Sequence, residues 1–134
     1  DLEARTMFGG LKTDAGRNRV VPIHSAIYDL VVANYNKAVA MGSDYLFNDE
    51  NGQQGTHLTY DKYRGRFGKI NKRFNMSHKP HDTRHTFISA AKSANMNEYI
   101  LKLIVGHEIL DVTEKVYTHR SMQELADEIE KIVY

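Results

Sequence analysis

The sequence predicts an α+β fold that is mainly helical, with a small antiparallel β-hairpin at the start followed by a helical bundle. Near the N-terminus, two short runs with β-branched residues flank an Asp/Gly turn. Through most of the remaining chain, apolar residues recur at spacings of three and four. The chain has 134 residues, of which 41% are hydrophobic and 26% charged. One domain of this size can bury a core without disulfides or metals.

The first elements follow from turn and capping residues. Extended runs at 5–11 and 17–23 flank the turn at 12–16, and together they predict the hairpin. Ser25 can cap a helix over about 26–41, because its hydroxyl can accept from a free backbone N–H. The polar loop at 44–56 holds one apolar pair, Leu46-Phe47, which we expect to anchor it to the core.

Later helices are bounded by similar signals. Thr59 can cap a helix over 60–74, and Pro80 interrupts the chain before a helix from about His81 to Ala94. Asn97 caps a predicted helix at 98–105, which Gly106 ends. A short helix is predicted from Asp111 or Thr113 to Tyr117, and Ser121 caps the last one. The predicted apolar stripes are Tyr63, Phe67, Ile70 and Phe74; Phe87, Ala90, Ala91 and Ala94; and Met122, Leu125, Ile129 and Ile132.

Charge is unevenly distributed along the chain, although the net charge is only +1. The segment 62–84 carries a charge of +7, and the last fourteen residues carry −3. A basic centre with an acidic tail favours a surface for a polyanion and a separate end that contacts protein. The alternative is a solvated helix face that happens to be basic. The basic residues are Lys62, Arg64, Arg66, Lys69, Lys72, Arg73, Lys79 and Arg84.

Composition excludes several classes of protein. With no cysteine, the chain has no disulfide, thiolate metal site or cysteine nucleophile. No apolar run is long enough to span a membrane, and no leader for export is visible, so we expect a cytoplasmic protein. Because the chain opens on Asp1 without a start methionine or a cap, we expect it to be a fragment of a longer protein.

Four features carry candidate chemistry. His81 and Arg84 share one face at a helix start, where free backbone N–H groups favour an anion. His107 follows Gly106 on a sharp turn, Tyr117 lies in a Val-Tyr-Thr-His segment, and Lys12 stands at the hairpin tip. Each also has an ordinary structural explanation: a capping histidine beside a surface arginine, a histidine at a helix end, a core tyrosine and a solvated lysine.

Taken together, these features resemble the catalytic domain of the tyrosine recombinases, the family of phage and transposon integrases. The resemblance covers nearly the whole chain. It rests on the hairpin Lys12-Thr-Asp-Ala-Gly-Arg-Asn-Arg-Val-Val-Pro-Ile23, the box His81-Asp-Thr-Arg-His-Thr-Phe87, Val105-Gly-His107 and Val116-Tyr-Thr-His119. Their order and spacing make a chance match improbable, and the His-x-x-Arg-His-Thr-Phe box is the most specific part.

The resemblance implies a function: site-specific DNA recombination that integrates or excises a mobile element. Tyr117 would be the nucleophile and would form a covalent 3′-phosphotyrosyl intermediate, which needs no ATP. Arg84 would clamp two phosphate oxygens, and His81 would handle a proton near the tyrosine. Lys12 would protonate the leaving 5′-oxygen, and His107 would hydrogen-bond the scissile phosphate. The scheme implies no cofactor and no metal.

The chain departs from the family pattern in what it lacks. The family's second clamping arginine comes from a segment before the small sheet, and Arg5 does not match its position. The resemblance therefore implies that residues 1–134 are a partial C-terminal catalytic domain, without the upstream helices and the N-terminal DNA-binding domain. We expect this fragment alone to be inactive or weakly active.

The resemblance also implies partners. These are double-stranded DNA attachment sites, further copies of the protein in a tetrameric synaptic complex, and accessory DNA-bending or directionality proteins. No membrane partner is expected, and the bacterial protein would associate with the nucleoid when bound to DNA. The helix after Ser121 should either fold back on its own domain or pack on another copy. Further candidate contacts with DNA phosphates are Arg17, Arg19, Lys62, Arg64 and Lys79.

Three alternative functions stay open. His81, His85 and His107 have a spacing that suits a zinc site, although Arg84 would place a positive charge close to the cation. A degenerate integrase would bind DNA without cutting it. A topoisomerase would share the tyrosine chemistry but would relax supercoils without a partner site.

Overall fold

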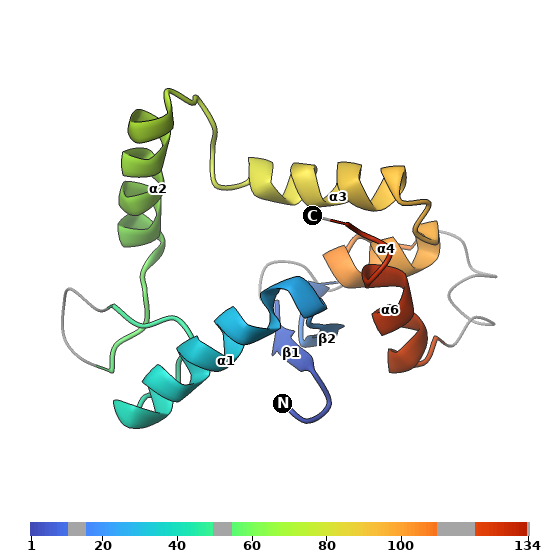
Figure 1. The fold of residues 1–134 in the computed structure, drawn as a ribbon, viewed down its shortest axis with the longest axis horizontal. Helices are drawn as coiled ribbons and strands as arrows, with labels where there is room; N and C mark the ends of the chain where they lie inside the picture. The colour runs from blue at the N-terminus through green and yellow to red at the C-terminus, as the bar shows by residue number, and fades with distance from the viewer. Residues whose placement is uncertain (11–15, 50–54, 110–119, 134) are drawn as a thin grey trace. The chain divides into compact units, whose positions relative to one another are not determined.

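The computed structural model describes residues 1–10, 16–49, 55–109 and 120–133. The chain divides into two compact units (Figure 1). We call Asp1–Tyr28 together with Arg84–Tyr134 the hairpin unit, and Asp29–Thr83 the α2 unit. The two strands and five helices of the described residues confirm the predicted α+β, mainly helical class. No helix among these residues is long and apolar enough to cross a membrane.

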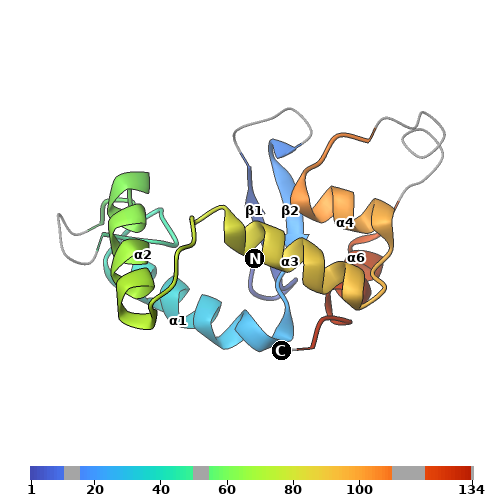
Figure 2. The same cartoon turned by 90° about the horizontal axis from the view of Figure 1, so that it is seen from above.

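The hairpin unit begins with the predicted antiparallel pair. Strand β1 (Thr6–Gly9) pairs with β2 (Arg19–Pro22), in a register that sets Thr6 opposite Pro22 and Gly9 opposite Arg19. Beyond the last pair, the Asn18 backbone N–H donates to the Gly10 carbonyl oxygen at 3.2 Å. In Figure 2, α4 lies beside β2. The small sheet therefore packs directly against the helices of this unit, through β2.

Helices supply the core of the hairpin unit. They are α4 (Glu98–Val105), α6 (Met122–Ile129) and most of α3 (Asp82–Ser93). The predicted caps at Asn97, Gly106 and Ser121 are confirmed, and Ser121 forms a reciprocal capping box with Glu124. The inward face predicted for α3 is also confirmed, with Ala91 fully buried. The core consists of Ala91, Met96, Ile100, Leu101, Ile104, Val105, Leu125, Ile129 and Ile132.

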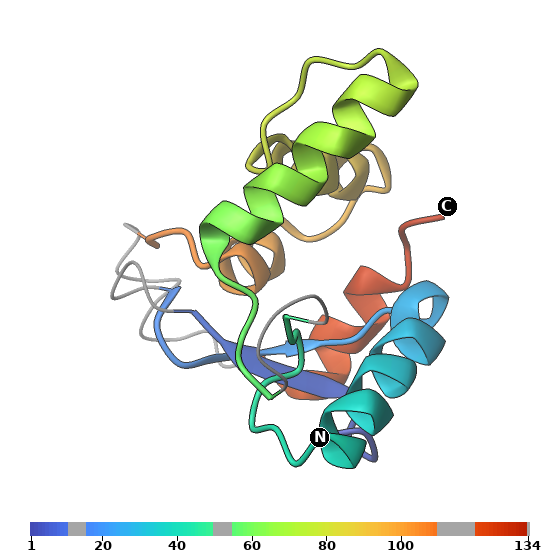
Figure 3. The ribbon, with the colours of Figure 1, turned by 90° about the vertical axis from the view of Figure 1, so that its left-hand side faces the viewer.

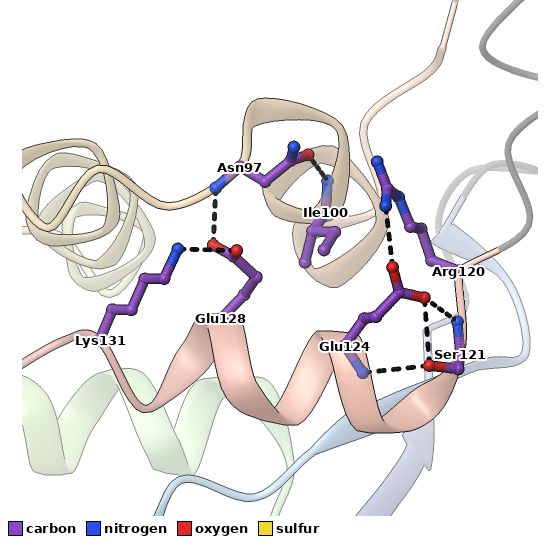
Figure 4. Close-up of polar contacts among 7 residues, drawn as sticks. All are labelled: Asn97, Ile100, Arg120, Ser121, Glu124, Glu128 and Lys131. Atoms are coloured by element: carbon purple, nitrogen blue, oxygen red, sulfur yellow. Dashed lines mark hydrogen bonds and ion pairs between the residues drawn. The ribbon is translucent and has the colours of Figure 1, made fainter.

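The C-terminal segment packs on its own chain in this structure, which is one of the two arrangements expected. Its side chains Leu125, Ile129 and Ile132 are buried in the core, and two carboxylates of the segment cap other helices. Glu128 accepts from the Asn97 backbone N–H at 2.8 Å, as Figure 4 shows. Glu130 accepts from the backbone N–H and the hydroxyl of Ser25 at 2.7 and 2.6 Å. Both apolar burial and helix capping thus hold α6 in place.

The α2 unit contains the rest of α1 (Ser25–Ala40) and all of α2 (Tyr60–Phe74), which Figure 3 shows from another side. Thr59 caps the start of α2 by accepting from the Lys62 backbone N–H. Asn75 ends the helix in the left-handed conformation, with φ of 51°. None of the fifteen residues of α2 is buried, so its predicted apolar stripe covers no core. The helix therefore depends on its caps and on polar contacts.

The loop before α2 is anchored differently from the prediction. Phe47 of the predicted anchor pair is 59% exposed, whereas Asp49 is 3% exposed. The Asp49 carboxylate pairs with the Lys62 ammonium and lies 3.1 Å from the Arg66 guanidinium. A buried carboxylate needs such partners, because desolvation disfavours an isolated charge. The ion pairs of Asp49 thus tie the loop to α2, and the Phe47 half of the predicted anchor is wrong.

Candidate functional site

His81 and Arg84 stand at the start of α3. His81 precedes the helix directly, and Arg84 is its third residue. The turn before the helix is closed by the Asp82 carboxylate, which accepts from the Lys79 backbone N–H at 2.9 Å. Thr83 adds a second contact, since its hydroxyl donates to the Pro80 carbonyl oxygen at 2.7 Å. These local bonds fix where the helix begins, and the chain order places Arg84 in its first turn.

His107 follows the end of α4. Gly106 has φ of 69°, a left-handed conformation that glycine adopts without strain. The backbone N–H of His107 donates to the Lys102 carbonyl oxygen at 3.0 Å, which closes the helix end. This tight turn leaves the imidazole exposed, on a chain segment that the helix cap holds in place.

Arg84 and His107 influence each other electrostatically, although 23 positions separate them in the chain. Partial burial lowers the pKa of His107, and the positive charge of Arg84 lowers it further. The imidazole is therefore kept neutral close to a guanidinium. A neutral imidazole donates from one ring nitrogen while the other accepts, so the pair presents hydrogen-bond donors with a single positive charge. Such a pair suits an anion.

Arg19 joins the hairpin to the end of α4. Its Nε donates to the Ile104 carbonyl oxygen at 3.0 Å, and its Nη1 donates to the Gly16 carbonyl oxygen at 2.8 Å. From the sequence, Arg19 was a candidate contact for a DNA phosphate, and its contact with the end of α4 was not predicted. Arg19 is the first residue of β2 and lies opposite Gly9. This position at the base of the hairpin loop is the signal that could have indicated a structural contact there.

The structure brings together only part of the predicted site. Arg84 and His107 interact, and His81 adjoins the same helix start as Arg84. Lys12 and Tyr117 lie outside the described residues, as does the predicted helix that ends at Tyr117. Within the described ranges, no three potential ligands gather to hold a metal ion.

The predicted DNA-contacting residues differ in their surroundings. Lys62 is paired with the buried Asp49. Arg64 is exposed, 3.3 Å from Asp61, and it lines a hollow with Lys79. Arg17 is exposed. The other residues around the hollow are Tyr60, Phe67, Gly68, Asn71, His78 and Pro80.

Comparison with known proteins gives the class. The sequence matches the phage integrase family over residues 1–124, and the chain belongs to that family. It is also similar to the tyrosine recombinase XerA of Pyrococcus horikoshii, with 26% identity over 116 residues. The matched part is 87% of this chain but only 40% of that relative. No solved structure gave a significant match.

Proposed function

We propose that residues 1–134 are the C-terminal catalytic part of a longer site-specific recombinase that moves a mobile element. In this proposal, Tyr117 cleaves DNA through a covalent 3′-phosphotyrosyl intermediate. The observation that carries it is membership of the phage integrase family over residues 1–124. The positive charge of Arg84, which adds to the lowering of the His107 pKa, supports placing both residues at one phosphate.

The reaction needs a nucleophile, a proton donor and positive charge at the phosphate. The Tyr117 hydroxyl loses its proton, which we assign to His81, and attacks the phosphorus. The bond from phosphorus to the 5′-oxygen breaks, and Lys12 protonates the leaving oxygen. Attack by a 5′-hydroxyl of the partner strand then reverses these steps and rejoins the DNA. Two phosphodiester exchanges balance, so no external energy source is required.

Arg84 and His107 have distinct roles in this scheme. The planar Arg84 guanidinium can donate two parallel hydrogen bonds to the non-bridging oxygens, which a lysine cannot do. The lowered pKa of His107 favours the neutral imidazole, which can donate one hydrogen bond to the phosphate. The proposal therefore assigns most of the clamp's charge to arginine.

The DNA surface in this proposal includes the hollow on α2. Arg64 and Lys79 supply positive charge there, and Tyr60 and Phe67 supply apolar surface. Phosphate contacts of this kind fix the register on DNA but do not read its sequence. The partners that we propose are attachment-site DNA and further copies of the protein, with accessory DNA-bending or directionality proteins.

The test is trapping of a covalent complex on a nicked DNA substrate by the full-length protein. We expect wild type to be trapped and Tyr117→Phe to be untrapped with DNA binding nearly unchanged. Tyr35→Phe is the matched control at an exposed tyrosine of α1, and it should trap like wild type. Full trapping by Tyr117→Phe would show that the nucleophile is wrong. Binding without trapping by wild type would favour a degenerate integrase instead.

Arg84 tests the clamp in the same assay. Arg84→Ala should lower the cleavage rate by about a hundredfold or more, because a preorganised donor to the phosphate is lost. Arg84→Lys should also be slow, since a point charge cannot replace the fork. Rejoining at the wild-type rate by the lysine variant would contradict bidentate recognition. Relaxation of a supercoiled plasmid without joining of two sites would indicate a topoisomerase.

A further inference from the structure

The Arg19 guanidinium occupies a tight slot between the hairpin and the end of α4. Two of its nitrogens donate to carbonyl oxygens from different parts of the chain, Gly16 and Ile104. The Gly16 residue is buried. The Ile104 carbonyl belongs to the last turn of α4, where backbone oxygens lack partners within the helix. Arg19 therefore caps α4 from a position 85 residues earlier in the chain.

Glycines form the walls of this slot. A Cβ atom added to Gly106 would lie 2.7 Å from the Gly16 Cα and 3.2 Å from Arg19 Nη1. A Cβ atom added to Gly10 would fall on the Gly16 carbonyl oxygen and lie 2.5 Å from the same nitrogen. Backbone atoms of the hairpin and of the α4 end therefore both approach the guanidinium closely. A residue larger than glycine at Gly10 or Gly106 would push the hairpin and the α4 end apart.

We propose that Arg19 is a positioning residue that locks the lysine-bearing hairpin against the Gly106-His107 turn, so that both sides of the cleavage site move as one body. This inference rests on the proposed function for its catalytic meaning. The Arg19 hydrogen bonds to Gly16 and Ile104 involve no residue that is assigned to the phosphate, although Ile104 lies just before the turn that carries His107. Arg19 thus acts through other residues and not on DNA.

The lock limits where Lys12 can go. Lys12 stands four residues before Gly16. Four residues span at most about 14 Å in any conformation, so holding Gly16 against α4 limits the reach of the chain that carries the proposed proton donor. Without the lock, the end of the turn could move away from α4, and the lysine would meet the leaving oxygen less often. Misplacement of a catalytic group by about 1 Å can cost about a hundredfold in rate.

The proposal differs measurably from a direct phosphate contact by Arg19. Lysine at this position would keep the charge for a phosphate, but its single ammonium cannot reproduce donation from both Nε and Nη1. A phosphate contact also contributes about 0.9 to the slope of log affinity against log salt, whereas a lock contributes nothing. Gly106 carries no charge, so Gly106→Ala removes no cation from the DNA surface and should leave the salt slope at its wild-type value.

The experiment compares Arg19→Lys, Arg19→Ala and Gly106→Ala in the full-length protein. We expect all three to lower the cleavage rate at saturating DNA by about tenfold to a hundredfold, with DNA affinity and its salt slope unchanged. The double variant Arg19→Ala/Gly106→Ala should be no slower than the worse single variant, because both changes open one junction. Gly42→Ala is the matched control: Gly42 also has positive φ, but its Cβ would meet nothing within 4 Å.

Amide hydrogen exchange of the DNA-free protein tests the lock without any cleavage. Arg19→Lys should speed exchange in both β2 and the Gly106-His107 turn, whereas Gly42→Ala should not. Unchanged exchange in Arg19→Lys would overturn the proposal. So would faster exchange with wild-type cleavage at saturating DNA, or a salt slope lowered by about 0.9 with the rate restored by lysine. Failure of wild type to form a covalent complex would instead overturn the proposed function, and exchange would still decide the lock.

Discussion

Helices α4 and α2 both carry apolar residues at helical spacing, but these residues lie in opposite environments. Five of the eight residues of α4 are buried, whereas none of the fifteen residues of α2 is. The sides of α4 are covered by residues from α6, from α3 and from β2 within one unit. The exposed aromatic side chains of α2, such as Tyr60 and Phe74, have no such cover in the α2 unit.

Helical periodicity therefore predicts a helix and its apolar face but not the partner of that face. In α4 the hydrophobic effect stabilises the fold, since its apolar area is removed from water. In α2 the stabilising contacts are polar: the Thr59 cap, the left-handed Asn75 and the Asp49 ion pairs. A helix held in this way can present aromatic and basic side chains to a ligand without losing its own structure.

Truncating the same residue type in both helices should give the largest difference. Ile100 of α4 is 2% exposed and Ile70 of α2 is 47% exposed. Ile100→Ala should lower the free energy of unfolding by about 2–5 kcal/mol, because it leaves a cavity in the core. Ile70→Ala should change it by about 0.5 kcal/mol or less. Denaturant unfolding of both variants measures this, and equal losses would mean that α2 is buried in solution.

The next test breaks the polar anchor of α2. Asp49→Asn should lower stability by about 1–3 kcal/mol, because the buried carboxylate that joins Lys62 and Arg66 is lost. Asp61→Asn is the matched control, since its pair with Arg64 is solvated and its side chain is 82% exposed. We expect the control to unfold like wild type. An effect of Asp49→Asn no larger than the control would show that the loop does not depend on this cluster.

Much of the fold was predictable because local rules decide it. The caps at Asn97, Gly106 and Ser121 follow from side-chain chemistry within one turn, and all three are confirmed. The hairpin is confirmed for the same reason. The predicted anchor at Phe47 was wrong, because apolar character alone does not determine which side chain is buried. Asp49 is buried instead, because it pairs with positive charges thirteen and seventeen residues later in the chain.

The candidate site was predictable to a smaller degree. The positive charge of Arg84 contributes to the lowered pKa of His107, and their assignment to one phosphate stays a prediction. The second role of Arg19 was missed because its carbonyl partner Ile104 lies 85 residues away, and no local pattern encodes such a contact. The roles of all five residues assigned to the cleavage site stay predictions: Lys12, His81, Arg84, His107 and Tyr117.

A smaller effect is expected where α6 caps α1. Hydrogen bonds from Ser25 lower the pKa of Glu130, against a smaller opposing effect of partial burial. Because the folded pKa is depressed, the stabilisation is complete above the ordinary glutamate pKa and is lost as pH falls through the folded value. Glu130→Gln should therefore cost about 0.5–1 kcal/mol near pH 7, a modest value because the side chain is 42% exposed.

Unfolding of Glu130→Gln at pH 7 and at pH values below the ordinary glutamate pKa measures this contribution. The variant should approach wild type as pH falls, and Ser25→Ala should be non-additive with it. Ser89→Ala, on an exposed part of α3, is the control and should show no coupling. A loss that persists unchanged at low pH would mean that the Glu130 charge does not stabilise the α1 start.

Two basic residues of α2, Arg64 and Lys62, should differ in how much they contribute to DNA affinity. Arg64 is exposed and lines the hollow with Lys79, whereas Lys62 is already paired with the buried Asp49. Arg64→Ala should lower the slope of log affinity against log salt by about 0.9, as for one lost phosphate contact. Lys62→Ala should lower it less, because an ammonium neutralised by a carboxylate releases fewer ions from DNA. Lys92→Ala, on α3, is the charge-matched control and should leave the slope unchanged. Affinities of the full-length protein at several salt concentrations measure the slopes. Equal slopes for the Arg64 and Lys62 variants would show that the Asp49 pair opens on DNA, and the polar anchor of α2 would then itself be part of the DNA-binding surface.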